Sequence, residues 1–160
     1  MINIGIGIKA PDFTLIDTNM KPVSLHDFYG QKVVLAFFIG EFTAICSMET
    51  CAFRDSMDRL IDLDAQVIGI SVNDPAENKS YAEENILPYP ILSDYNHEVS
   101  KRYGLEASLA SEGSIVEKRS IIIIDQEGII QYLWVASRPD EEPNYQEIQD
   151  KVAKITKRQN

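Results

Sequence analysis

The chain has 160 residues, 44% of them hydrophobic, and a formal net charge of −10. This length suits one globular domain over residues 1–160, with a core large enough to fold without disulfide staples. The acidic balance excludes nucleic acid and anionic membranes from the expected partners and is explained simply by solubility. Neither a secretory signal nor an apolar run long enough to span a bilayer is visible, so we expect a cytoplasmic protein.

The first part of the chain predicts a hairpin, a helical turn and a buried strand. Residues 13–16 and 22–25 are short strand-like runs joined through the turn-forming segment 17–21, which favours an antiparallel hairpin. His26 to Gly30 suits a helical turn that ends at the glycine. Val33–Phe38 is a continuous apolar run, which is typical of a strand buried on both faces.

Helical spacing follows the buried strand. From about Thr43 to Leu63 the apolar residues recur mostly three or four positions apart, which predicts a helix. Residues 66–71 are a second apolar run and predict another buried strand. Asp74 and Pro75 then suit the N-cap and the first position of a further helix.

Prolines interrupt the next segment, residues 86–92, which predicts a connector with a short strand at its end. We expect a helix to start at residues 93–94 and to end at Gly104.

The last part of the chain predicts a hairpin and a helix. Residues 120–125 and 129–135 are apolar strands flanking a turn that contains Gly128. Asn144 and Glu147 form a capping pattern that opens the last helix. The order of elements predicts an α/β, thioredoxin-like fold with a mixed central sheet, helices on both faces and an N-terminal β-hairpin.

Two cysteines, Cys46 and Cys51, are the only sulfhydryls of the chain and follow the strand at 33–38. That position is the expected first turn of a helix, where unpaired N–H groups and the helix dipole favour thiolate over thiol. A thiolate is the form of cysteine that attacks electrophiles such as peroxides. Because a domain of this size needs no staple, we interpret the pair as chemical rather than structural.

Several ordered motifs carry a resemblance to a known family. They are Ala10–Leu15, the segment Phe42–Asp55 with Thr43, Cys46, Glu49, Cys51 and Arg54, Val67–Ser71, Leu92–Asp94, Lys118–Ser120 with Asp125 and Gly128, and Trp134 with Glu142, Pro143 and Tyr145. With these motifs the sequence resembles the peroxiredoxins of the AhpC/TSA superfamily, and within them the bacterioferritin-comigratory-protein (PrxQ) type and its archaeal relatives. Two cysteines at this spacing would by themselves be weak evidence for the family, whereas the full set of motifs in this order is specific to it.

The resemblance implies a thiol-dependent peroxidase that reduces hydrogen peroxide and organic hydroperoxides. Cys46 corresponds to the peroxidatic cysteine, which would become a sulfenic acid, and Cys51 to the resolving cysteine, which would form an intramolecular disulfide with it. A thioredoxin-like dithiol would reduce that disulfide. The chemistry implied needs no metal, haem or flavin cofactor. The oligomeric state, monomer or homodimer, stays open.

Three further residues take roles from the resemblance. Arg119 would contact the thiolate and the peroxide oxygens with its guanidinium, although an arginine that opens an apolar strand is, taken by itself, more often a solvated strand end or a salt-bridge partner. The Thr43 hydroxyl would bond the thiolate or a peroxide oxygen, or else be a plain N-cap. Glu49, one helical turn beyond Cys46, would orient Arg119 rather than transfer protons.

One position departs from the family pattern. Peroxiredoxins usually carry proline seven residues before the peroxidatic cysteine, and here that position is Ile39, followed by Gly40. Isoleucine can still exclude water, but the glycine leaves the loop less constrained than proline would.

The spacing of Cys46 and Cys51 makes a geometric prediction. Five residues along a helix rise ~7.5 Å and turn ~500°, so the two Cα atoms stand more than ~8 Å apart on different faces. A disulfide tolerates at most ~7 Å between Cα atoms. We therefore expect a reduced, helical state with separated sulfurs and an oxidised state in which the first turns of the helix are unwound.

Three alternatives remain at this point. The protein could be a one-cysteine peroxidase in which Cys51 is a packed bystander. It could be a thioredoxin-like disulfide exchanger, which is disfavoured because exchangers use a closer Cys-x-x-Cys spacing. It could also be a non-catalytic redox sensor or chaperone-like module in which Ile39 has weakened the peroxidase chemistry.

Overall fold

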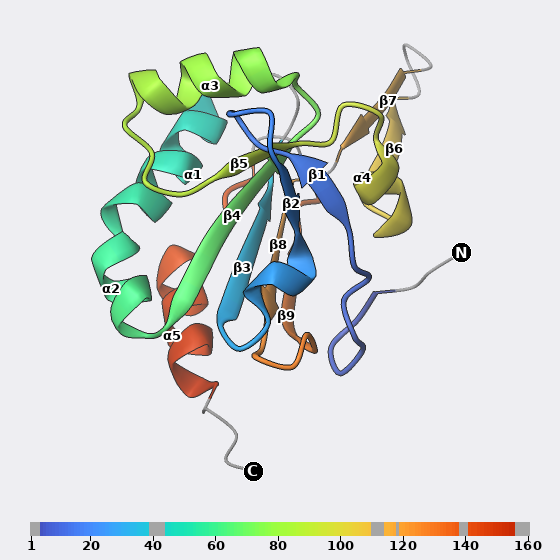
Figure 1. The fold of residues 1–160 in the computed structure, drawn as a ribbon. Coiled ribbons are helices and arrows are strands. Elements are labelled where there is room, and N and C mark those ends of the chain that lie inside the picture. Colours follow the sequence, from blue (N-terminus) through green and yellow to red (C-terminus); the bar gives the residue numbers. More distant parts are fainter. Residues whose placement is uncertain (1–3, 39–43, 110–113, 118, 138–140, 156–160) are drawn as a thin grey trace.

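The computed structural model describes residues 4–38, 44–109, 114–117, 119–137 and 141–155 (Figure 1). Within these residues, seven strands form one sheet in the order β2-β1-β5-β4-β3-β8-β9. Their bounds are Thr14–Ile16 (β1), Pro22–Ser24 (β2), Lys32–Phe37 (β3), Ala65–Ser71 (β4), Ile91–Ser93 (β5), Ser120–Ile124 (β8) and Ile130–Val135 (β9). Strands β3, β4 and β5 are parallel, whereas β1 and β8 join them antiparallel, so the sheet is mixed as predicted.

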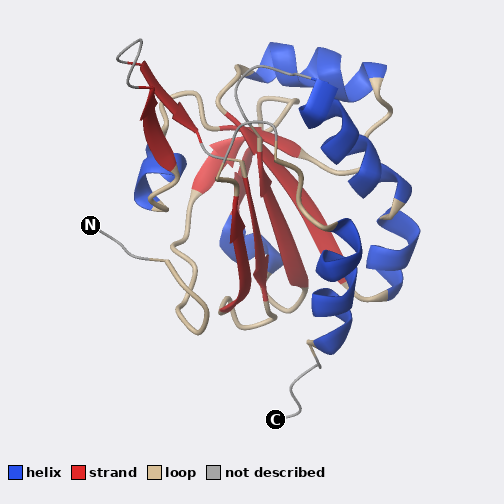
Figure 2. Cartoon of the chain, turned by 180° about the vertical axis from the view of Figure 1, so that it is seen from behind, coloured by secondary structure: helices blue, strands red, loops and turns tan. Residues whose placement is uncertain are grey.

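Five α-helices and one 3-10 turn accompany the sheet in the described part of the chain. They are η1 (Leu25–Phe28), α1 (Ala44–Asp55), α2 (Met57–Asp62), α3 (Pro75–Glu84), α4 (Glu98–Arg102) and α5 (Tyr145–Lys154). None of the described helices is long and apolar enough to cross a membrane. Figure 2 shows the sheet from behind, with long helices along one side and the small two-stranded unit away from it.

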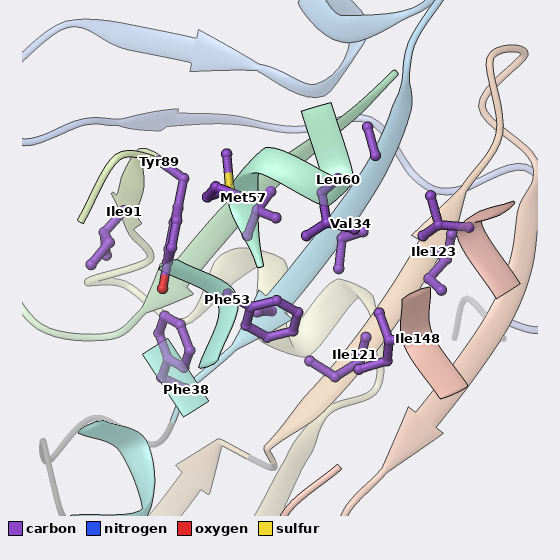
Figure 3. Packing of buried hydrophobic residues seen from close by; sticks show 14 of the residues in the cluster. Val34, Phe38, Phe53, Met57, Leu60, Tyr89, Ile91, Ile121, Ile123 and Ile148 are labelled. Carbon is purple, nitrogen blue, oxygen red and sulfur yellow. The ribbon is translucent and has the colours of Figure 1, made fainter. Parts of the chain in front are cut away.

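The continuous apolar run of β3 explains why both faces of the sheet are covered. Side chains of a strand alternate between its faces, and every residue of β3 is buried. Val34 and Phe38 pack with Phe53, Met57 and Ile148 from α1, α2 and α5 (Figure 3). On the opposite face the core cluster combines other residues of β3 with residues of η1, α4 and the N-terminal segment, namely Val33, Leu35, Phe37, Phe13, Leu25, Val99 and Tyr103. The predicted thioredoxin-like arrangement is thereby confirmed.

Local capping signals identified several elements correctly. The side chain of Asp74 accepts a hydrogen bond from the amide of Glu77 at 2.8 Å, which caps α3. Asn144 accepts one from the amide of Glu147 at 3.0 Å and caps α5. The N-terminal hairpin β1–β2 and the hairpin β8–β9 also form as predicted.

The structure differs from the predicted elements in three places: two helices have other bounds, and one hairpin was missed. The helix expected over residues 43–63 is divided at Ser56, whose amide bonds to the carbonyls of Ala52 and Phe53. The helix expected at residues 93–94 begins only at Glu98, because the Asp94 carboxylate accepts bonds from amides five and six residues further on.

The third difference is a hairpin that the sequence pattern did not indicate. Strands β6 (Glu106–Leu109) and β7 (Ser114–Glu117) pair antiparallel outside the main sheet (Figure 1). Each strand has only four residues, EASL and SIVE, and a pattern this short is too brief to predict a strand by itself.

Gly69 of β4 gives a testable link between the core and the end of β3. A Cβ at this position would lie 2.7 Å from Cε2 of the buried Phe38 ring, too close for the ring to stay in place. We expect Gly69→Ala to lower the free energy of unfolding by about 1–3 kcal/mol, measured by urea denaturation. The double variant with Phe38→Leu should lose less than the sum of the two single variants, and strictly additive losses would contradict this cause.

Candidate active site

Two of the sequence-predicted residues, Cys46 and Arg119, lie on or next to elements that begin at the same end of the sheet. Strand β3 ends at Phe37, and helix α1 begins at Ala44 (Figure 1). Strand β8 runs antiparallel to β3, with Ser120 opposite Phe37. Arg119 directly precedes Ser120 and therefore lies at the end of the sheet where β3 stops. The chain continues from this same end of β3 towards α1. The topology brings the predicted cation and the cysteine-bearing helix to one end of the fold.

Arg119 is almost completely buried, with 1% of its surface exposed. Its carbonyl accepts a hydrogen bond from the amide of Ala136 at 2.8 Å, which fixes the backbone beside β9. The alternative of a solvated strand end is therefore wrong. Burial of a guanidinium costs free energy unless anions or hydrogen bonds compensate for it. A buried arginine at this end of the sheet therefore suits a site that binds or stabilises negative charge.

Cys46 is the third residue of α1, so its backbone lies in the first turn of the helix, as predicted. The first N–H groups of a helix have no intrahelical partner, and they point out of its N-terminal end, where they can bind an anion. Glu49 belongs to the same helix, one turn further on. The side chains of Cys46 and Glu49, and the whole of Thr43, lie outside what the structure describes, so their roles stay predictions.

The helical backbone between the two cysteines is continuous. Helix α1 runs from Ala44 to Asp55 and includes both Cys46 and Cys51. At this spacing a regular helix holds the Cα atoms more than ~8 Å apart, beyond the reach of a disulfide. The described backbone thus has the geometry that was predicted for the reduced state.

Cys51 is half-buried and contacts the end of helix α3. Its Sγ lies 3.8 Å from Oδ1 of Asn85, the residue that caps the C-terminus of α3. The amide group of Asn85 donates to the carbonyl of Tyr81 at 2.9 Å, which fixes its orientation. The thiol of Cys51 therefore occupies a defined polar position between two helices rather than a purely apolar core.

Arg54 lies beside the same cysteine. Its Nη1 donates to the carbonyl of Asn85 at 2.8 Å, and its Nε donates to Asp55 at 3.1 Å. The bond to Asp55 raises the pKa of Arg54, and its charge interactions with Cys51 and Asp55 act in the same direction.

Three hydroxyl-bearing residues near the cysteines were missed by the sequence reasoning. Thr50 Oγ1 and the Tyr81 hydroxyl are 2.6 Å apart, and the Tyr89 hydroxyl donates to the carbonyl of Thr50 at 2.8 Å. Each bond joins residues 31 or 39 positions apart in sequence. No local pattern could have indicated these contacts, because only the packing of α3 and the connector against α1 brings the groups together.

Comparisons with known proteins agree with this arrangement. The model of the AhpC/TSA family matches residues 6–133. Peroxiredoxin Q from Arabidopsis thaliana is 40% identical over 128 residues, and its counterpart from Triticum aestivum is 38% identical over the same length; both are named as chloroplastic. The matched region covers 80% of this chain but 58% of each of those proteins.

A solved structure extends the comparison to three dimensions. Peroxidoxin BcpB from Mycobacterium tuberculosis superimposes with a TM-score of 0.84 at 25% identity, covering 96% of this chain and 99% of the other. These similar proteins come from plants and a bacterium, and the archaeal affiliation stays a prediction.

Proposed function

This chain belongs to the AhpC/TSA family, and on that premise we propose that it is a thiol-dependent peroxidase of the PrxQ type. One observation carries the proposal. Cys46 lies in the first turn of α1, and this helix follows the C-terminal end of β3. The buried Arg119 lies at the same end of the sheet, because β8 runs antiparallel to β3. Backbone N–H groups and a guanidinium at this end can stabilise a thiolate.

In the first step the Cys46 thiolate attacks the terminal oxygen of a hydroperoxide. The O–O bond breaks, Cys46 becomes a sulfenic acid, and the departing alkoxide or hydroxide takes a proton to leave as alcohol or water. Arg119 stabilises the negative charge as it moves from sulfur to the departing oxygen. Thr43 holds the peroxide or the thiolate by its hydroxyl, and Glu49 orients Arg119.

The second step uses Cys51. Its sulfur attacks the sulfenic sulfur of Cys46, which forms the disulfide and releases water. The helical spacing of the two residues requires the first turns of α1 to unwind before the sulfurs meet. A thioredoxin-like dithiol then reduces the disulfide by thiol–disulfide exchange and restores the helical state.

The substrate and partners are proposed by class. Hydrogen peroxide and organic hydroperoxides are the electrophiles that this chemistry accepts, and the reductant is a thioredoxin-like protein. The acidic net charge of −10 argues against nucleic acid and membrane surfaces as further partners. We place the reaction in the cytoplasm, where thiol reductants are abundant.

Mass spectrometry after one equivalent of hydrogen peroxide tests the roles of both cysteines. We expect the wild-type chain to lose two hydrogens, because a disulfide forms, and the Cys51→Ser variant to gain one oxygen, because its sulfenic acid has no partner. Blocking free thiols before the measurement should leave the wild-type disulfide unlabelled. A wild-type chain that gains one oxygen would instead make Cys51 a bystander in a one-cysteine peroxidase.

A further inference from the structure

Three buried residues that carry hydroxyl groups are joined by hydrogen bonds at the middle of helix α1. We call this set the hydroxyl clasp, and it consists of Thr50, Tyr81 and Tyr89. Thr50 is 0% exposed, Tyr81 8% and Tyr89 3%. Tyr81 bonds to the Thr50 side chain at 2.6 Å, and Tyr89 donates to the Thr50 carbonyl at 2.8 Å. Figure 3 shows Tyr89 among the core residues, with its oxygen directed towards the ribbon of α1.

The clasp holds the segment of the chain that must rearrange. Thr50 lies between Cys46 and Cys51, inside the loop that a disulfide between them would close. Bringing their Cα atoms within ~7 Å requires new backbone angles in residues 47–50, because a regular helix keeps them further apart. Both bonds to Thr50 depend on its position in the intact helix, one through its carbonyl and the other through its side chain.

The partners of Thr50 are themselves held in place. Tyr81 belongs to α3, and Tyr89 lies between two prolines in the connector that follows this helix. Both rings pack in the core cluster with Phe38 and Phe53. Because proline restricts the backbone around Tyr89, its hydroxyl has little freedom to follow Thr50 when the helix unwinds.

We propose that the hydroxyl clasp stabilises the helical, reduced form of α1 and must release Thr50 before the Cys46–Cys51 disulfide can form. Tyr81 and Tyr89 are thus positioning residues that act through Thr50 on the resolving step. The inference rests on the proposed function, since it concerns the disulfide of that reaction.

The clasp affects the balance of the second step rather than its chemistry. The sulfenic acid of Cys46 and the thiol of Cys51 give the disulfide and water whether or not the clasp is present. A buried hydrogen bond that exists only in the helical form opposes this step by the amount that it stabilises that form. Removing the bond should therefore favour the disulfide, and it should do so about three- to tenfold.

Tyr89→Phe is the test variant, and Tyr103→Phe is its matched control. Both changes remove one hydroxyl from a buried tyrosine that donates to a backbone carbonyl, but Tyr103 donates to Pro11 on the opposite face of the sheet. The first readout is the equilibrium between reduced and oxidised protein in mixtures of reduced and oxidised dithiothreitol. The oxidised form accepts the two electrons, so no peroxide is needed. We expect Tyr89→Phe to make the disulfide about three- to tenfold harder to reduce, a potential shift of about 15 to 30 mV, and Tyr103→Phe to leave it unchanged.

The second readout is kinetic and separates the two steps. Rapid quenching after peroxide addition gives the rate of sulfenic acid formation and the rate of disulfide formation by mass. In Tyr89→Phe we expect the ratio of the second rate to the first to rise about three- to tenfold. Tyr81→Phe removes the second tyrosine hydroxyl of the clasp and should change the ratio of the two rates in the same direction.

The outcomes distinguish failure of the clasp from failure of the peroxidase. An unchanged dithiothreitol equilibrium in Tyr89→Phe, or an equal shift in Tyr103→Phe, would overturn the clasp. So would a wild-type chain that forms no disulfide between its cysteines at any dithiothreitol ratio. A chain that forms the disulfide in these buffers, shifts as expected in Tyr89→Phe, and yet gives no sulfenic acid with peroxide would keep the clasp and refute the peroxidase.

Discussion

Replacing Cys46 by serine is expected to slow peroxide consumption by more than about 1000-fold. A serine hydroxyl stays protonated at neutral pH where a cysteine beside a helix N-terminus and a cation can be an anion, so the nucleophile is lost. The measurement is the second-order rate of hydrogen peroxide loss with dithiothreitol as the reductant. Because serine is a close match in size, circular dichroism should show an unchanged helical content.

The matched control for this variant is Cys51→Ser. It removes the other sulfur of α1 but keeps the proposed nucleophile, so its first turnover with peroxide should match that of the wild type. Comparable loss of this first turnover in both variants would mean that the reaction does not begin at Cys46. Full activity in Cys46→Ser would refute the proposed function outright.

Substituting the buried Arg119 by methionine is expected to slow sulfenic acid formation by about 100- to 1000-fold. The loss follows from removing the donors that stabilise charge on the sulfur and on the departing oxygen. Arg119→Lys keeps the charge but not the planar fork, so we expect it to recover part of the rate. The rate is measured by stopped flow over a range of pH, and in Arg119→Met the profile should move to higher pH because the thiolate loses its cation.

Stability measurements keep this test specific. Arg119 is 1% exposed, so its charge is costly to bury and methionine can fill much of the same volume. We therefore expect urea unfolding to show little loss of stability in Arg119→Met. A variant that folds normally and reacts with peroxide at the wild-type rate would remove Arg119 from the site.

The sequence predicted the central sheet well because its signals are local. The continuous apolar run of β3 could be buried only between two layers, and every one of its residues is buried. Asp74 and Asn144 cap the helices that follow them, and each accepts a hydrogen bond from an amide only three residues further along the chain. The same locality placed Cys46 in the first turn of a helix after a buried strand.

Other features depend on contacts that no local pattern records. The start of α4 is set by the carboxylate of Asp94 reaching forward to the amides of Val99 and Ser100. The polar partner of Cys51 is Asn85 at the C-terminal cap of α3, 34 residues away in sequence. The burial of Arg119 was likewise invisible, because an arginine at the start of a strand is compatible with either solvent or a buried site.

The division of the helical segment at Ser56 has a consequence for the durability of the protein. Ser56 accepts a hydrogen bond from Gln149 of α5 at 3.1 Å, and the next residues, Met57 and Leu60, are packed in the core. Unwinding that starts at the N-terminus of α1 therefore meets a second, separately anchored helix before it reaches those side chains. We therefore expect repeated formation and reduction of the proposed disulfide to leave the core around Met57 and Leu60 packed, so that the domain survives many cycles without global unfolding.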